Sequence, residues 1–425
     1  MIQTVRGVHD ILPDAIPLWQ FLEARALAIF GQYGFEEIRT PLFEKTELFA
    51  RAVGATTDIV EKEMYTFSDR GGDSLSLRPE GTASVVRAFV QQSMHRQLPW
   101  KVWYRGPMFR YERPQKGRQR QFHQIGCELF GPEDPLADAE LLAMVMRYLT
   151  DIGLQTSLVL EINSLGCPDC RPPYRDLLIA FLRQTASHLC DDCQNRMERN
   201  PLRVLDCKQE RCRAAIATAP VMIDHLCPGC THHFSRLKGH LVDLERPFRI
   251  NPHMVRGLDY YNRTAFEVTS VGLGAQNAVA AGGRYDGLVA QMGGTPTPAI
   301  GFAMGMERLA LLLDQGKNRP APPDVYLAPL GEQAEQAGLK LAETLRAQGL
   351  AVTLNLGGGS LKSQMKRAGR SRARFALMIG EAELEKKVVI LKEMALGEQQ
   401  EIRHSEVPGF LVNACRTISV GDGHR

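Results

Sequence analysis

Eight of the ten cysteines form four close pairs in one stretch of the sequence. The pairs are Cys167 with Cys170, Cys190 with Cys193, Cys207 with Cys212, and Cys227 with Cys230. Each pair has a ligand spacing seen in structural zinc sites, where four thiolates surround one ion. Eight thiols suffice for two such sites, and metal binding would stabilise an inserted domain that has a limited core. We therefore predict structural Zn2+ in this stretch.

The spacing leaves other uses of these thiols open. A set of free cysteines in a helical insertion is the competing interpretation, and an iron–sulfur cluster is a further one. His232 and His233 are reserve ligands, and the spacing does not say which pairs share an ion. A disulfide framework is disfavoured because the sequence has no secretion signal and a reducing cytosol keeps thiols free. The thiols would in either case have a structural role.

Further strings carry arginine, glutamate and tyrosine at characteristic positions. No G-x-x-x-x-G-K-[ST] loop occurs, so a bound nucleotide would need another kind of fold. Three strings resemble the signature motifs of class II aminoacyl-tRNA synthetases: residues 78–82, 109–114 and 301–308. Three more resemble peptides of histidyl-tRNA synthetases: residues 6–13, 256–261 and 281–288. The resemblance covers nearly the whole chain in the expected order, which makes it more specific than any single motif.

The resemblance implies both a fold and a reaction. The fold would be α+β: helices flank the antiparallel sheet of a class II synthetase, a helical cysteine-rich insertion interrupts it, and a C-terminal α/β domain binds the anticodon. Histidine, ATP and Mg2+ would give histidyl-adenylate, and the 3′ end of tRNA(His) would then take the histidyl group. The family also implies a homodimer, formed through residues 35–41.

Adenylate formation brings a carboxylate to a phosphate, so the chemistry needs cations between two anions. Arginine suits this task because its planar fork binds phosphate oxygens and keeps its charge. By resemblance, Arg110 holds the α-phosphate, Arg308 stacks on or near the nucleotide, and Arg256 is the extra cation at the reacting centre. Glu112 and Arg118 would lie beside the nucleotide. A single arginine is more often part of a surface ion pair, but three in three matched motifs favour the functional interpretation.

The resemblance also supplies a set of residues around the amino acid. Glu80 would accept a hydrogen bond from its ammonium group, while Glu128 and Tyr261 would bind the two ends of the imidazole. Gln124 alternates with Glu128 on one strand and should face the same side. The full set is Glu80, Gly81, Thr82, Arg110, Gln124, Glu128, Arg256, Tyr260 and Tyr261, with Tyr285 completing the pocket. Tyr285 is nearly as well explained as a core residue.

Two basic segments are candidate contacts for tRNA. The loop at 113–120 is where class II enzymes meet the acceptor end, and Gln115 and Arg120 are the positions to test. In the C-terminal part, four basic residues recur at helical spacing and would form a phosphate-facing stripe: Lys362, Lys366, Arg367 and Arg370. A solvated hairpin tip and a solvated helix face are the alternatives.

Local patterns indicate the elements that must position these groups. Apolar residues at helical spacing predict a helix at 17–33. Alternating runs between 75 and 130 predict an antiparallel strand pair joined by the basic loop. Strands are expected at 266–271 and 299–304, the second followed by a helix at 305–313. After a proline-rich linker at 318–324, strands at 325–328, 351–356, 375–379 and 388–391, with helices at 332–348 and 361–369, predict a small α/β domain with a largely parallel sheet.

These elements suggest four segments: catalytic residues 1–165, the insertion at 166–249, catalytic residues 250–320 and an anticodon-binding domain at 321–425. The 425 residues, 44% hydrophobic and 23% charged, are typical of a globular protein. No apolar run has the length of a signal peptide or a membrane span, so a cytoplasmic location is expected. With a net charge of only +3, affinity for nucleic acid must come from local patches.

Two other functions remain to be weighed. One is the catalytically silent paralogue that serves as a regulatory subunit in histidine biosynthesis, which generally lacks the C-terminal domain and the intact 256–261 peptide. The other is a zinc-dependent RNA-binding module, which leaves the arginines of the class II motifs unexplained. Both features that the paralogue lacks are present here, so the sequence favours the ligase.

Overall fold

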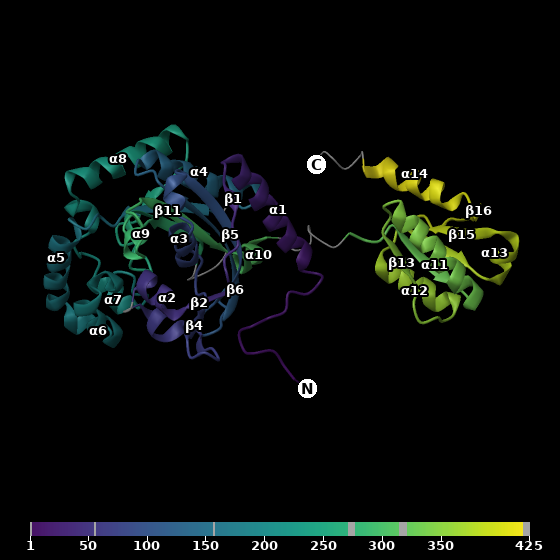
Figure 1. The fold of residues 1–425 in the computed structure, drawn as a ribbon, viewed down its shortest axis with the longest axis horizontal. Helices are drawn as coiled ribbons and strands as arrows, with labels where there is room; N and C mark the ends of the chain where they lie inside the picture. The colour runs from purple at the N-terminus through teal and green to yellow at the C-terminus, as the bar shows by residue number, and fades with distance from the viewer. Residues whose placement is uncertain (1, 55–56, 156–157, 271–276, 314–320, 420–425) are drawn as a thin grey trace. The chain divides into compact units, whose positions relative to one another are not determined.

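The computed structural model describes most of the chain as two compact units, Met1–Arg319 and Pro320–Arg425, and each is considered by itself (Figure 1). The described ranges are 2–54, 57–155, 158–270, 277–313 and 321–419. Within those ranges, no helix is both long and apolar enough to span a bilayer.

Eight strands form the main sheet of the first unit. In spatial order they are β1 (Glu36–Glu37), β5 (Trp100–Phe109), β6 (Gln121–Phe130), β11 (Ala299–Gly305), β10 (Ala278–Arg284), β9 (Asn262–Ser270), β7 (Leu158–Ser164) and β8 (Arg249–Ile250). The six central strands pair antiparallel, and only the two-residue strands at the edges pair parallel. The predicted antiparallel sheet and its strand pair at the basic loop are confirmed. Residue 271, the end of one predicted strand, lies outside the described ranges.

A small second sheet and two sets of helices complete the sheet-containing body of the first unit. The second sheet contains β2 (Phe43–Lys45), β4 (Ser74–Leu77) and β3 (Thr66–Ser68). One face of the main sheet shares its core with α1 (Ile16–Gln32), α4 (Pro135–Asp151), α8 (Pro228–Asp243) and α10 (Met306–Leu312). The other face packs against α2 (Thr46–Val53), α3 (Thr82–Gln91) and α9 (Leu288–Gln291). Helix α1 confirms the helix predicted at 17–33; its proline suits a first turn, and left-handed Gly34 follows its end.

Alternation along β6 separates these two faces. Ile125, Cys127 and Leu129 join the core beneath α1 and α4. Residues 124, 126 and 128 therefore point to the opposite face, toward the α3 side, because side chains alternate along a strand. One strand thus contributes to the apolar core on one face and carries two of the predicted substrate residues on the other.

A buried ion pair fastens α4 to the sheet. Arg284 of β10 and Asp138 of α4 are both fully buried and form a hydrogen-bonded ion pair. Arg284 Nη2 also donates to the Pro132 carbonyl at 2.6 Å, and Thr264 Oγ1 donates to Asp138 Oδ2 at 2.5 Å. Burial raises the pKa of Asp138 to about 6, although the charge of Arg284 opposes that shift. Removing one partner would leave the other buried charge without compensation.

The cysteine-rich stretch is helical, as predicted. It contains α5 (Arg171–Gln184), α6 (Asp191–Arg199) and α7 (Glu210–Ala215), which gather at one end of the first unit (Figure 1). These helices enclose a core of their own that includes Tyr174, Leu178 and Leu182. Helix α8 follows them, but its Phe234, Leu237 and Leu241 belong to the core of the main sheet.

The second unit combines one five-stranded sheet with four helices. The sheet order is β13 (Val352–Leu354), β12 (Val325–Pro329), β14 (Phe375–Ile379), β15 (Val388–Glu393) and β16 (Gln399–Arg403). The helices are α11 (Glu332–Ala347), α12 (Leu361–Ser371), α13 (Glu381–Lys386) and α14 (Val407–Ser419). The predicted α/β class is confirmed. The predicted linker begins at 318, and its first residues lie outside the described ranges.

The prediction of a largely parallel sheet was wrong for half of its pairings. Strand β12 is parallel to β13 and β14, but β14–β15 and β15–β16 are antiparallel. A parallel crossover needs about a dozen residues or more, and the short helix α13 leaves too little chain between β14 and β15. Strand β16 was missed because its only buried residue is Ile402. The division of the whole chain into four segments stays a prediction.

The Arg284–Asp138 pair gives the first test. Arg284→Met should lower the free energy of unfolding of the first unit by about 3–5 kcal/mol, because Asp138 is left buried and unpaired. The three tryptophans at 19, 100 and 103 all lie in this unit, so urea unfolding followed by tryptophan fluorescence reports on it. Arg25→Met, which breaks the exposed pair with Asp151, is the matched control and should cost no more than about 1 kcal/mol. An equal loss of free energy of unfolding in the two variants would contradict the stabilising role of the buried Arg284–Asp138 pair.

Candidate active site and metal centres

Glu128 of β6 lies at the centre of a buried hydrogen-bond network. Its Oε1 accepts from Thr82 Oγ1 at 2.7 Å and from the Tyr104 hydroxyl at 3.4 Å, and its Oε2 accepts from the Tyr285 hydroxyl at 2.5 Å. A Cβ at Gly301, its neighbour on β11, would lie only 1.7 Å from Glu128 Oε2. Glycine at 301 is therefore required for the carboxyl group to occupy this position.

Glu80 caps the first turn of α3. Its Oε2 accepts from the Thr82 amide at 2.7 Å and its Oε1 from the Ala83 amide at 2.8 Å. The first amides of a helix have no partner within it, so a carboxylate is stabilised there. A Cβ at Gly81 would lie 2.2 Å from the Tyr104 ring. Thr82 thus connects the two acidic side chains, through its amide to Glu80 and through its hydroxyl to Glu128.

The three predicted tyrosines line the same buried cluster. The ring of Tyr260 lies 4.6 Å from that of Tyr261 and 5.6 Å from that of Tyr285. Arg256 Cζ lies 5.4 Å from the centre of the Tyr261 ring. The hydroxyl of Tyr285 is bound to Glu128, so this tyrosine contributes a polar contact in addition to its packing.

The predicted nucleotide residues converge from β5, the basic loop and α10. Arg110 Nε donates to the Pro79 carbonyl at 2.8 Å, next to Glu80, and Arg308 Nη1 donates to the Ala278 carbonyl at 2.7 Å. Burial lowers the pKa of Arg308, and the positive charges of Arg118 and then Arg110 lower it further. Such cationic crowding is typical of a site that receives an anion.

Glu112 and Glu267 hold these cations in place. Glu112 Oε2 lies 2.9 Å from Arg118 Nη1, and Glu112 Oε1 lies 3.8 Å from Arg110 Nη1. Glu267 Oε1 accepts from Arg256 Nη1 at 2.5 Å. Despite the burial of Arg256, which lowers its pKa, the carboxylate of Glu267 raises the pKa above its usual range. Arg256 therefore stays a cation.

Buried polar atoms at this site that have no hydrogen-bond partner among the described residues include the Tyr260 hydroxyl. Two others are Oε1 of Gln124 and Nε of Arg256. Gln124 shares the face of Glu128 with Gly126 between them, and a Cβ at 126 would lie 2.4 Å from Tyr104. Unsatisfied buried groups are costly, so a polar ligand that binds them would stabilise the site.

The structure brings the predicted histidine and nucleotide residues together, and it adds three that the sequence analysis missed. These are Tyr104 on Glu128, Glu267 on Arg256, and Glu307, which accepts from the His123 amide at 2.9 Å. Glu307 lies within the matched string at 301–308, but the resemblance assigned it no role. Tyr104 becomes evident only from the register of β5 beside β6, and Glu267 only from the way the segment before β9 folds back against that strand.

Of the two candidate tRNA contacts in the basic loop, one is exposed and the other already makes contacts within the protein. Gln115 is exposed, and its backbone pairs with that of Arg118. Arg120 is half-buried, with Cζ 3.9 Å from the Tyr111 ring and its amide bound to the Gly7 carbonyl at 2.7 Å. In the second unit, the four basic residues of the stripe are exposed on α12, and Arg367 also binds Asn355 at 2.7 Å.

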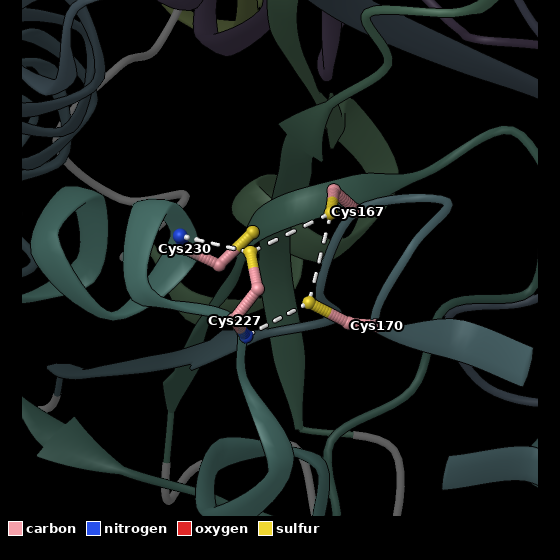
Figure 2. A group of neighbouring side chains, drawn as sticks. All are labelled: Cys167, Cys170, Cys227 and Cys230. Atoms are coloured by element: carbon pink, nitrogen blue, oxygen red, sulfur yellow. Dashed lines mark hydrogen bonds between the residues drawn. The ribbon is translucent and has the colours of Figure 1, made fainter. Parts of the chain in front are cut away.

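The eight thiols form two separate groups, which we name by their nesting in the sequence. The outer cluster is Cys167, Cys170, Cys227 and Cys230, and the inner cluster is Cys190, Cys193, Cys207 and Cys212. Within each group the four sulfurs lie within 4.8 Å of one another. Figure 2 shows the outer cluster, where Cys167 Sγ lies 3.6 Å from Cys170 Sγ and 3.8 Å from Cys227 Sγ.

Both clusters fit a single tetrahedral ion. Zinc–sulfur bonds of about 2.3 Å place the sulfurs of a tetrahedral site close to 3.8 Å apart, and Cys190 Sγ and Cys207 Sγ of the inner cluster lie 4.0 Å apart. All four positions are thiols, so no coordination position is left for a substrate. Neither reserve histidine joins a cluster: His232 is exposed, and His233 Nε2 lies 3.6 Å from Asp138 Oδ2. The thiol groups are suited to a structural metal.

Comparison with known proteins agrees with this geometry. A model of histidyl-tRNA synthetases matches residues 7–167 and 201–309, and a model of the anticodon-binding domain matches 324–414. The chain belongs to the histidyl-tRNA synthetase family. It is 52% identical to the histidine–tRNA ligase of Geobacter metallireducens over 403 residues, which cover 95% of this chain and 97% of the relative. The resemblance and the fold expected from the sequence are thus confirmed.

Further relatives cover the chain almost completely. The histidine–tRNA ligase of Syntrophotalea carbinolica is 52% identical over 416 residues, 98% of this chain and 99% of the relative. The apo histidyl-tRNA synthetase of S. aureus has 36% identity and a TM-score of 0.80, over 97% of this chain and 100% of that one. The synthetase family model does not match residues 168–200, which contain three of the eight clustered cysteines.

The buried carboxyl group of Glu128 gives a test by pH. Burial raises its pKa to about 8, against the lowering effect of the bonds from Thr82 and Tyr285. An unfolded glutamate titrates near about 4.3, so between these values the folded state holds the extra proton and loses stability as pH rises. From pH 5 to 7.5 the wild-type free energy of unfolding should fall relative to that of Glu128→Gln by up to about 1.4 kcal/mol per pH unit. Urea unfolding followed by tryptophan fluorescence measures both profiles, and parallel profiles would contradict the raised pKa.

Proposed function

We propose that the buried site around Glu128 activates L-histidine with ATP and that the chain then transfers the histidyl group to the 3′ end of tRNA(His). Relatives named histidine–tRNA ligases align over nearly the full length at about half identity, and they support this function. The observation that carries the residue assignments is a continuous set of charge contacts among three arginines, 110, 256 and 308, and the buried acidic pair. Arg110 acts on Glu80, which acts on Glu128. Arg308 is near Arg110 and Glu267, and Glu267 in turn pairs with Arg256.

The two acidic side chains account for recognition of histidine. Glu80 accepts from the α-ammonium group, and Glu128 and Tyr261 bind the imidazole from its two ends. Because its pKa is about 8, Glu128 holds a proton at neutral pH before the substrate binds. The imidazole therefore meets a carboxylic acid that can share its proton with a ring nitrogen or donate it. Gln124 supplies a free buried oxygen, and an amino acid that leaves these groups unpaired is rejected.

The arginines account for adenylate formation. The histidine carboxylate attacks the α-phosphorus of ATP, a bond to the bridging oxygen breaks, and pyrophosphate leaves. Arg110 binds the α-phosphate, Arg308 lies against the nucleotide with Glu112 and Arg118 beside it, and Mg2+ neutralises the phosphate oxygens. Arg256, kept cationic by Glu267, brings the attacking carboxylate and the phosphate together.

The remaining assignments concern partners and architecture. The loop at 113–120, with Gln115 and Arg120, meets the acceptor end, and the stripe on α12 meets the tRNA phosphates near the anticodon. The chain acts as a cytoplasmic homodimer joined through residues 35–41. The insertion holds structural Zn2+, as the closed thiol clusters favour. The regulatory-subunit alternative is not supported, since the relatives match the second unit as well as the 256–261 peptide.

Purified protein should charge bulk tRNA with histidine in an ATP-dependent reaction. Arg256→His should reduce histidine-dependent ATP–pyrophosphate exchange by at least about 100-fold, the usual cost of losing one fixed positive group at a reacting centre. Its fold should persist, as judged by tryptophan fluorescence. Arg51→His, which removes an exposed arginine of α2, is the matched control and should exchange at the wild-type rate. Near-normal exchange by Arg256→His would refute the role of Arg256.

A further inference from the structure

The outer cluster lies beside the peptide that carries the specificity residues. Cys167 and Cys170 follow β7, while Cys227 and Cys230 begin α8, so the chain enters and leaves the insertion at this cluster. Figure 2 shows the two thiols from the start of α8 facing the two from the loop. The turn before Cys170 is tight: Gly166 has φ +65°, and a Cβ there would lie 2.7 Å from Cys170 Cβ. The cluster thus joins both ends of the insertion at one point.

Three contacts connect this point to residues 255–263. Arg171, directly after Cys170, donates through Nη2 to the Tyr261 carbonyl. Val255, directly before Arg256, packs against the thiol-lined core of the insertion. Arg263 exchanges two backbone hydrogen bonds with the turn before Cys167: its amide donates to Gly166 at 2.8 Å, and its carbonyl accepts from Leu165 at 2.6 Å.

Packing between the peptide and the insertion is incomplete. A cavity of about 390 Å³ lies between them and is lined by Arg171, Tyr174, Arg203, Arg256, Leu258 and Tyr261. The ring of Tyr261 packs in the core of the first unit, and the bond from Arg171 restrains its backbone from the side of the insertion. The position of Arg171 depends in turn on Cys170, its neighbour at the start of α5.

We propose that the insertion binds two Zn2+ ions, one in each cluster, and that the outer ion positions Arg256 and Tyr261 for histidine binding through Arg171. The positioning part rests on the proposed function. Each ion binds four thiolates, so each thiol loses its proton on binding. The sulfurs of one cluster all lie close enough to reach a single ion, whereas a multi-iron cluster would spread its ligands over several metals. Arg171 is a positioning residue, since it contacts the backbone of Tyr261 and no substrate atom.

The inner ion has a different role. Its cluster holds α6 and α7 together, and this part of the insertion reaches the catalytic body through polar contacts that are exposed or only part-buried. Arg196 Nη2 lies 3.0 Å from Asp58 Oδ2, and Asn200 Nδ2 donates to Asp259 at 3.2 Å. Exposed polar contacts contribute little stability, so loss of the inner ion should affect the histidine site less than loss of the outer ion.

The experiment compares two matched thiol variants of the full-length protein. Metal analysis of the wild type should find two zinc ions per chain, and both C227S/C230S and C190S/C193S should retain one. In ATP–pyrophosphate exchange, C227S/C230S should raise the KM for histidine by about tenfold or more, as losses of supporting contacts around a site commonly do, and leave the KM for ATP near the wild-type value. C190S/C193S should change the histidine KM by less than about threefold.

Arg171→Met keeps the test decisive if C227S/C230S does not fold. It should retain both zinc ions yet raise the histidine KM, and Arg171→Lys, which keeps one donor, should restore part of the loss. A wild type with no zinc, or with iron, would overturn the metal assignment. A wild-type histidine KM in Arg171→Met, or an equal rise in the KM for ATP, would overturn the positioning role. Absence of histidine-dependent exchange in the wild type would instead refute the proposed function, and the zinc count would still decide the metal assignment.

Discussion

The first unit depends on a carboxyl group buried inside an antiparallel sheet. Glu128 is fully buried, and the low-polarity surroundings disfavour its charged form strongly enough to raise its pKa to about 8. Such a group is tolerated only where donors surround it, and Thr82 and Tyr285 provide them. The glycine at 301 leaves the necessary space. The threonine, the tyrosine and the glycine therefore meet one requirement: they hold a buried acidic group in place where a polar ligand can reach it.

The sheet meets this requirement by giving its two faces different tasks. Apolar residues of β6 pack beneath α1 and α4, while the alternate positions face α3 and the tyrosines. On the face opposite the tyrosines, the Arg284–Asp138 pair fixes α4 to the same sheet. A well-packed face keeps strand register constant, because a slip of one residue would move every side chain to the wrong face. Precise placement of Gln124 and Glu128 is thus a consequence of packing on the opposite face.

Sequence patterns predicted much of this arrangement, with limits that have physical causes. Alternation identified the strand pair around the basic loop, the motif strings contain Glu80 and the three arginines, and the resemblance added Glu128. Tyr104 and Glu267 escaped notice because their importance arises from contacts of the folded chain, between β5 and β6 and between β9 and the segment before it, which no local pattern encodes. The sequence also left open which cysteine pairs would bind the same ion, since similar spacings permit several groupings. Only the fold brings Cys167 close to Cys227. In the second unit, chain length between β14 and β15 decided strand direction against a pattern that suggested parallel strands.

Elements of different stiffness contribute to the two halves of the site. Arg110 immediately follows β5, and Arg308 lies in the first turn of α10, so hydrogen-bonded secondary structure positions both arginines that we propose to bind the nucleotide. Arg256, Tyr260 and Tyr261 lie between β8 and β9 without a helix or strand of their own. Such a segment has more conformational freedom to lose, and contacts from elsewhere must restrain it. The insertion supplies those contacts, but its own core is small. A structural metal can stabilise a small core and needs only a few residues as ligands. The cysteine-rich stretch is therefore attached where the catalytic body has the least rigid part of its substrate pocket.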